Sequence, residues 1–152
     1  MTYWLMKSEP EVYSIEDLKQ DNTTIWDGVR NYQARNYLKQ MQKGDIAFFY
    51  HSNCKMIGIV GLMTIVESNV IDRTQFDANS PYFDPKSTIN NPRWHTVKVQ
   101  FKEKFTEIIS LNTLKEEFTS NELLVVKKGN RLSVIPIPEN TAKKIILKSI
   151  NK

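Results

Sequence analysis

The chain has 152 residues, of which 40% are hydrophobic and 25% charged, an ordinary balance for one globular domain and not for a disordered protein. Cys54 is the only cysteine and there are two histidines, which argues against a disulfide framework and a Cys-rich zinc site. The net charge is +4, and residues 96–152 hold 11 Lys/Arg against 6 Asp/Glu. Such a basic half can attract phosphates, although a solvated lysine-rich surface has the same composition.

The first half of the chain predicts two strands and two helices. A strand over 3–7 ends before Pro10, and Ser14 to Asp17 resembles a capping box that starts a helix at about 14–20. Asn31 can cap a second helix over 32–41. A buried strand over 46–50 follows the turn at Gly44.

The second half predicts further strands around a long irregular stretch. Gly58 and Gly61 lie inside a strand over 56–66, where glycines indicate a bulge or a bend. The stretch 71–92 is long enough to be functional or mobile. The remaining predicted elements are a strand over 96–105, a helix from Ser110 to about Phe118, a short helix starting at Ser120, a strand over 132–137, and a terminal helix to about Ser149. We therefore expect an α+β fold with a mixed sheet curled into a small barrel and helices at its periphery.

No catalytic or phosphate-loop signature is present. His51 and Cys54 could form a base and a nucleophile, but three residues apart at a strand end their side chains diverge. The N-terminal apolar run is too short for a signal peptide or a membrane span. We expect no metal, no cofactor and no membrane partner, and a reducing compartment that is cytoplasmic, or nuclear in a eukaryote.

The segment 26–36 concentrates aromatic and forked polar side chains at a predicted helix N-terminus. Trp26 offers a flat face for stacking a base, and Arg30 and Asn31 offer donors to base edges or phosphates. The alternative is structural, with Trp26 in the core and Arg30 paired with Asp27.

Seven motifs in order carry a resemblance to a known family. They are Tyr3–Pro10, Trp26–Asn36, Gly44–Asp45, Phe49–Asn53, Tyr82–Ser87, Pro92–Trp94 and Arg131–Val134. Over nearly its whole length the chain resembles the EVE domain family. This resemblance implies a PUA-like pseudo-barrel, related to YTH, ASCH and PUA domains, that binds nucleic acid (DNA or RNA) or a nucleotide through a modified base.

The related YTH domains suggest where a base would lie. Lys7, Ser8 and Glu9 stand where those domains have a Lys-Ser-Asn stretch, and Trp26-Asp27 stands at their pocket tryptophan. A carboxylate at Glu9 accepts a hydrogen bond from an exocyclic amine, which favours cytosine over methyladenine.

The resemblance and the residue types together predict one binding site. Trp26 would form the stacking wall, and Trp94 or Tyr82 a second wall. The predicted base-pocket residues are Lys7, Ser8, Glu9, Trp26, Asp27, Ser52, Asn53, Tyr82 and Trp94. The predicted phosphate and rim residues are Arg30, Asn31, Tyr32, Arg35, Asn36, His51, Arg131 and Ser133.

Two other functions remain open from the sequence. Some ASCH relatives are small amidohydrolases that act on acylated cytidine, and Lys7 and Glu9 could support that chemistry. A protein-interaction module with a vestigial pocket is the third possibility.

Overall fold

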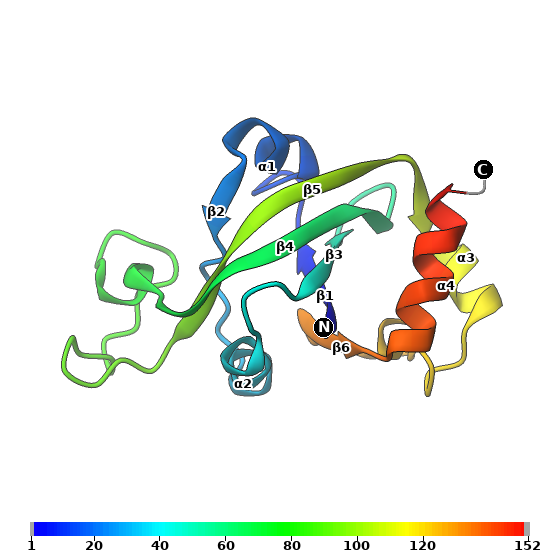
Figure 1. Cartoon of the computed structure of the whole chain (residues 1–152). Coiled ribbons are helices and arrows are strands. Elements are labelled where there is room, and N and C mark those ends of the chain that lie inside the picture. Colours follow the sequence, from blue (N-terminus) through cyan, green and yellow to red (C-terminus); the bar gives the residue numbers. More distant parts are fainter. Residues whose placement is uncertain (1, 151–152) are drawn as a thin grey trace.

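The computed structural model describes residues 2–150, which fold around a mixed sheet with strand order β2-β5-β4-β3-β1-β6 (Figure 1). The strands are β1 (Tyr3–Ser8), β2 (Thr23–Ile25), β3 (Ile46–His51), β4 (Gly58–Ile71), β5 (His95–Ser110) and β6 (Val134–Ile137). The helices are α1 (Ile15–Asp21), α2 (Tyr32–Gln40), α3 (Leu111–Glu117) and α4 (Glu139–Ile150), with short 3-10 helices at Arg73–Phe76 and Leu124–Val126. Strands β1 and β3 pair in parallel and the other neighbours antiparallel, which confirms the predicted α+β class and mixed sheet.

Alternation along the strands sends side chains into two separate cores. In β1, Trp4 and Met6 join one core while Leu5 between them joins the other, as the two-residue period of a strand requires. The first core also holds apolar side chains of α1 and α2, and the second holds those of α3 and α4. The sheet is therefore buried on both faces, and each helix pair covers one face.

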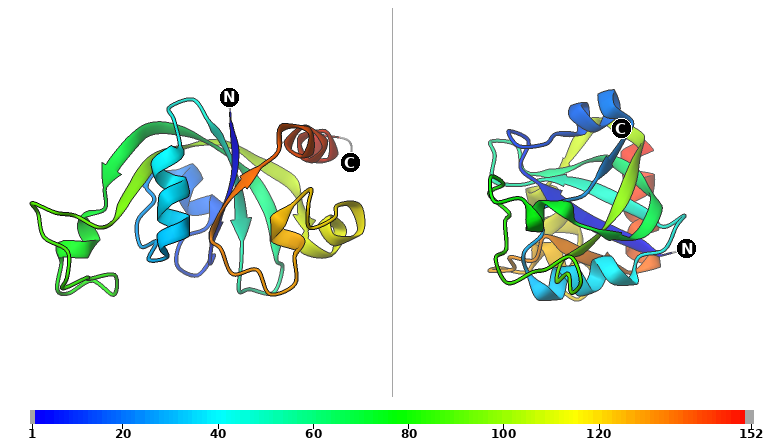
Figure 2. Two further views of the ribbon diagram at one scale, coloured as in Figure 1. Left: turned by 90° about the horizontal axis from the view of Figure 1, so that it is seen from below. Right: turned by 90° about the vertical axis from the view of Figure 1, so that its left-hand side faces the viewer.

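Strands β4 and β5 form a long curved pair that runs the length of the molecule (Figures 1 and 2). The segment 72–94 lies at one end of this pair, and α3 and α4 lie at the other. The register between the strands shifts near Gly61, where an added Cβ would lie 2.3 Å from the carbonyl oxygen of Glu103. The irregularity predicted from the glycines is confirmed, and the two backbones approach each other closely at Gly61.

Three of the predicted helix starts are confirmed by their caps. Ser14 and Asp17 form a reciprocal capping box, with N–O distances of 3.1 and 2.9 Å. The Asn31 side chain accepts from the amide of Ala34 at 2.9 Å. Ser110 caps α3 in the same way.

Several boundaries differ from the predictions. No helix begins at Ser120, because residues 119–122 form a turn closed by Thr119 and a 3-10 helix starts only at Leu124. Strand β2 was not predicted, since three residues carry no periodic signal and pairing with β5 decides their conformation. Pairing also lengthens β4 to Ile71 and β5 to Ser110 through polar residues.

Candidate functional site

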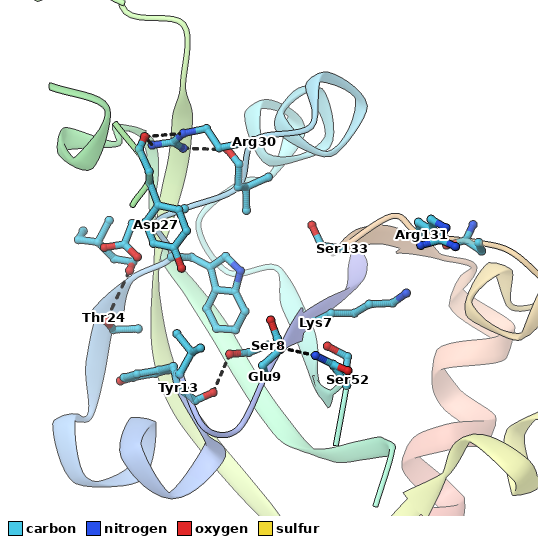
Figure 3. Close-up of a pocket in the computed structure, with 18 residues that line it drawn as sticks. Lys7, Ser8, Glu9, Tyr13, Thr24, Asp27, Arg30, Ser52, Arg131 and Ser133 are labelled. Carbon is cyan, nitrogen blue, oxygen red and sulfur yellow. Dashed lines mark hydrogen bonds between the residues drawn. The ribbon is translucent and has the colours of Figure 1, made fainter. Parts of the chain in front are cut away.

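A pocket of about 810 Å³, here the main pocket, opens where β1 and β3 end, opposite residues 24–30 (Figure 3). Its volume is in the range of pockets that enclose small-molecule ligands. It is lined by Lys7, Ser8, Glu9, Val12, Tyr13, Thr24, Ile25, Trp26, Asp27, Gly28, Val29, Arg30, Ser52, Asn53, Tyr82, Asn130, Arg131 and Ser133.

Parallel pairing brings the polar ends of two strands together. Lys7 and Ser8 of β1 lie opposite Tyr50 and His51 of β3, so the residues that follow each strand leave the sheet at the same edge. There the Asn53 amide donates to a carboxylate oxygen of Glu9 at 2.6 Å. This pair presents an amide and an acceptor carboxylate side by side at the pocket, a suitable combination for a base edge.

Trp26 forms one wall and is anchored in the core. Its side chain is 7% exposed, belongs to the core under α1 and α2, and meets the ring of Phe49 edge-on at 5.3 Å. The structural interpretation of Trp26 as a core anchor is confirmed. Trp26 also lines the main pocket, and its stacking on a base stays a prediction.

Tyr82 reaches the main pocket from the long segment because Gly28 leaves room for its ring. A Cβ on Gly28 would lie 2.7 Å from that ring, and the positive φ of +86° also favours glycine. The Arg30 guanidinium then donates two hydrogen bonds to the carbonyl of Tyr82, at 3.0 and 2.7 Å.

Arg30 is paired with Asp72 and not with Asp27, which corrects the structural alternative. The Arg30–Asp72 contact measures 3.0 Å, and the Asp72 side chain is 2% exposed against 22% for Arg30. The same carboxylate accepts from the backbone amides of Gly28 at 2.8 Å and Thr74 at 2.9 Å. Asp72 thus joins its own loop to the segment 28–30 at the pocket. Asp72 was not predicted as a site residue, because nothing local distinguishes it from other loop aspartates.

Burial changes the ionisation of two groups in the main pocket. Desolvation lowers the pKa of the Lys7 ammonium. Desolvation raises the pKa of the Asp27 carboxyl, and the nearby negative charge of Asp72 raises it further. Both groups therefore carry their charge at a cost, which an incoming ligand of opposite charge or a hydrogen-bond partner would offset.

Trp94 lies outside the set of residues lining the main pocket, so of the two residues predicted for the second wall, Trp94 or Tyr82, only Tyr82 lines that pocket. The Trp94 ring stacks on Tyr32 with centroids 4.9 Å apart and planes at 15°, and its indole nitrogen donates to Asp84. The Arg35 guanidinium lies 4.8 Å from the Tyr32 ring centre. These side chains fasten the segment 72–94 to α2.

Other predicted rim residues also have structural contacts away from the main pocket. Asn31 caps α2, and Asn36 accepts from the guanidinium of Arg35. His51 is buried, and its Nε2 accepts from the amide of Ile15 at 3.1 Å. Six predicted site residues therefore do not line the main pocket: Asn31, Tyr32, Arg35, Asn36, His51 and Trp94.

The remaining predicted residues do line one pocket: Lys7, Ser8, Glu9, Trp26, Asp27, Arg30, Ser52, Asn53, Tyr82, Arg131 and Ser133. Seven lining residues were not predicted from the sequence: Val12, Tyr13, Thr24, Ile25, Gly28, Val29 and Asn130. Gly28 was detectable, because it stands inside a motif already singled out. Thr24 and Ile25 depend on β2, which was not predicted.

Residues 2–150 contain no helix with both the length and the apolar character needed to cross a membrane. Within the same range, no three His, Cys, Asp or Glu side chains gather into a set that could hold a metal ion.

Comparison with known proteins identifies the family. The EVE domain model matches residues 2–148. Rat thymocyte nuclear protein 1 is 54% identical over 155 residues, which cover 90% of this chain and 69% of that protein. A crystal structure of the human THYN1 protein in complex with DNA containing 5-methylcytosine has a TM-score of 0.93 and 42% identity, and covers 100% of this chain and 99% of the other.

A more distant structure supports the predicted PUA-like fold. The YTH domain of the Zygosaccharomyces rouxii MRB1 protein, in complex with N6-methyladenosine RNA, has a TM-score of 0.56 at 15% identity over 97% of this chain and 86% of that one. At this identity the likeness concerns the fold alone. The family match over residues 2–148, together with the 54% identity to rat thymocyte nuclear protein 1, shows that the chain belongs to the EVE domain family.

Proposed function

We propose that the protein is a non-catalytic nucleic-acid-binding module that recognises a modified base of cytosine type in the main pocket. The observation that carries this proposal is the similarity to the human THYN1 protein, whose structure holds DNA containing 5-methylcytosine. The pocket composition supports it, since aromatic walls lie beside the Glu9–Asn53 pair at the strand ends. The location expected for such a module is the cytoplasm, or the nucleus in a eukaryote.

The chemistry of the pocket favours an amino-bearing base edge. Glu9 is exposed and its carboxylate can accept from an exocyclic amine, while Asn53 next to it can donate to a ring acceptor. Trp26 and Tyr82 supply apolar faces for the ring, and such stacking contributes roughly 1–3 kcal/mol per base. A base must leave its stack to enter, at a cost of a few kcal/mol, so single-stranded nucleic acid is the easier target.

The test is a calorimetric titration with three single-stranded oligonucleotides of one sequence, containing cytosine, 5-methylcytosine or N6-methyladenine at the centre. We expect the tightest binding to 5-methylcytosine. Glu9→Gln, which keeps the shape and removes the charge, should weaken that binding about tenfold, because a hydrogen bond to a charged group contributes about 1.5–3 kcal/mol. Glu11→Gln is the matched control, since Glu11 is exposed and does not line the pocket.

Equal affinity for the three oligonucleotides, or tighter binding of N6-methyladenine, would contradict the proposal. The amidohydrolase alternative predicts that the wild type converts N4-acetylcytidine to cytidine and that Lys7→Ala abolishes this turnover. The interaction-module alternative predicts a folded protein that binds none of the oligonucleotides.

A further inference from the structure

A second, smaller pocket of about 290 Å³ adjoins the main pocket. We call it the lysine pocket. It is lined by Lys7, Tyr50, Ser52, Asn53, Ile57, Leu111, Lys115, Val125, Lys127, Lys128, Gly129 and Asn130. The lysines come from three distant parts of the chain: β1, α3 and the turn after the second 3-10 helix.

The lining of the lysine pocket is positively charged. Its lining holds four lysines and no aspartate or glutamate. Among residues 2–150, the ion pairs involve other lysines, namely Lys104, Lys143 and Lys148. Lys115, Lys127 and Lys128 are exposed at the rim, whereas Lys7 is half-buried beside the Tyr50 ring, 5.8 Å from its centre. Like charges gathered in one depression attract an anion, and the half-buried one gains most from it.

The two pockets lie side by side. They share Lys7, Ser52, Asn53 and Asn130 as lining residues. In Figure 3 the Lys7 side chain extends from β1 toward the side of the main pocket where Arg131 lies. A nucleotide whose base lies near Glu9 and Asn53 would have its sugar at this shared boundary, and its phosphate would be directed to the lysines.

We propose that the lysine pocket binds a phosphate group covalently attached to the nucleotide whose base occupies the main pocket. This inference rests on the proposed function and deepens it, since it assigns a subsite for the sugar-phosphate. Three lysines of the basic segment 96–152, namely Lys115, Lys127 and Lys128, then converge on one pocket. Lysine suits this role as a point charge that tolerates a range of phosphate positions.

The experiment measures binding of a fluorescent single-stranded oligonucleotide, containing one 5-methylcytosine, at increasing salt. The variant is Lys127→Gln/Lys128→Gln, whose side chains are exposed so that the fold is retained. The matched control is Lys143→Gln/Lys144→Gln, an exposed adjacent pair on α4 that lines neither pocket and removes the same charge. Two further probes, 5-methyl-2′-deoxycytidine and its 5′-monophosphate, are titrated without label.

For the lysine-pocket variant we expect about tenfold weaker oligonucleotide binding at about 50 mM salt. The slope of log K against log salt should fall by about 0.7 for each phosphate that the variant no longer neutralises. Binding of the nucleoside should not change. Weakening with the oligonucleotide alone would assign the pocket to a backbone phosphate, and weakening with the monophosphate as well would assign it to the 5′-phosphate of the bound nucleotide.

The inference is overturned if the lysine-pocket variant and the α4 control have the same affinity and salt slope. If the wild type binds modified and unmodified oligonucleotides equally, but the lysine-pocket variant still binds them more weakly than the α4 control does, the result counts against the proposed function alone. A wild type that binds none of the probes overturns both.

Discussion

His51 shows how a single side chain links the sheet to a helix beside the main pocket. Its Nε2 accepts from the Ile15 amide at 3.1 Å, which ties the end of β3 to the start of α1. The bond requires a neutral imidazole, because the protonated ring has no acceptor. Burial lowers the pKa of His51, in keeping with that requirement. The sequence placed His51 at a phosphate rim, and only the packing of α1 against β3 assigns it this structural contact.

The stability of the fold should depend on pH through His51. Its folded-state pKa is depressed, so the folded protein binds fewer protons than the unfolded chain. The stabilisation is present above the unfolded pKa of about 6.5 and is lost as pH falls through the lower folded value. Urea unfolding at pH 7.5 and pH 5.5 measures the difference. His51→Gln keeps a hydrogen-bond acceptor and cannot titrate, so we expect a smaller difference in unfolding free energy between the two pH values.

The pKa of His95 is also lowered, mainly by burial, so His95 contributes in the same direction. His95→Gln is therefore the matched comparison, and it should remove only the part of the pH dependence of stability that comes from His95. A His51→Gln variant that keeps the full pH dependence of the wild type would disprove the assignment to His51.

At the scale of elements, the β4–β5 pair determines how the sheet curves. Its register shifts near Gly61, where the backbones approach too closely for a side chain. The predicted strand contained the two glycines, so an irregularity was foreseeable from sequence. The residue that lies against Gly61 was not foreseeable, because it is Glu103, which is 42 positions away in the chain.

Gly61→Ala should destabilise the protein by about 3 kcal/mol, near the upper end of the usual cost of overpacking, because the Glu103 carbonyl is backbone and cannot rotate away. Gly44→Ala is the control. It has a positive φ of +97° but open space around it, so we expect only the conformational cost of about 1 kcal/mol. Denaturant unfolding gives both values, and hydrogen exchange should quicken near Lys104 only in Gly61→Ala. Equal destabilisation by the two variants would contradict the steric explanation.

At the scale of the whole molecule, the segment 72–94 becomes one wall of the main pocket through buried polar contacts. Gln75 is fully buried, and its amide donates to the carbonyls of Asp72 and Trp94 at 2.6 and 2.9 Å. Its oxygen accepts from the amides of Arg93 and Trp94. These bonds join the two ends of the segment, and the Arg30–Asp72 pair joins it to the pocket.

Asp72→Asn should loosen this wall, because it removes the negative charge that pairs with the Arg30 guanidinium. The new amide group would also face the donors that now bond to the Asp72 carboxylate. We expect a loss of about 2–3 kcal/mol in unfolding free energy. Hydrogen exchange should be faster across 72–94, and oligonucleotide binding weaker because Tyr82 is no longer held. Glu139→Gln, which removes an exposed ion pair with Lys143, should leave the unfolding midpoint nearly unchanged. Normal exchange across 72–94 in Asp72→Asn would argue against this role.

The sequence by itself determined the features that depend on neighbouring residues. The caps at Ser14, Asn31 and Ser110 arise from contacts within three positions, and the alternating strands reveal themselves by their own period. The ordered motifs identified the family and most of the predicted base-pocket residues that line the main pocket.

Only the tertiary structure decided the features that depend on distant pairing. Strand β2, the partnership of Arg30 with Asp72, and the position of Trp94 against Tyr32 join residues at least 42 positions apart. No local pattern encodes such contacts, because they form only when the sheet brings its edges and loops together. The lysine pocket has the same origin: its charges are scattered in the chain and meet only when β1, α3 and the turn at 127–130 pack side by side.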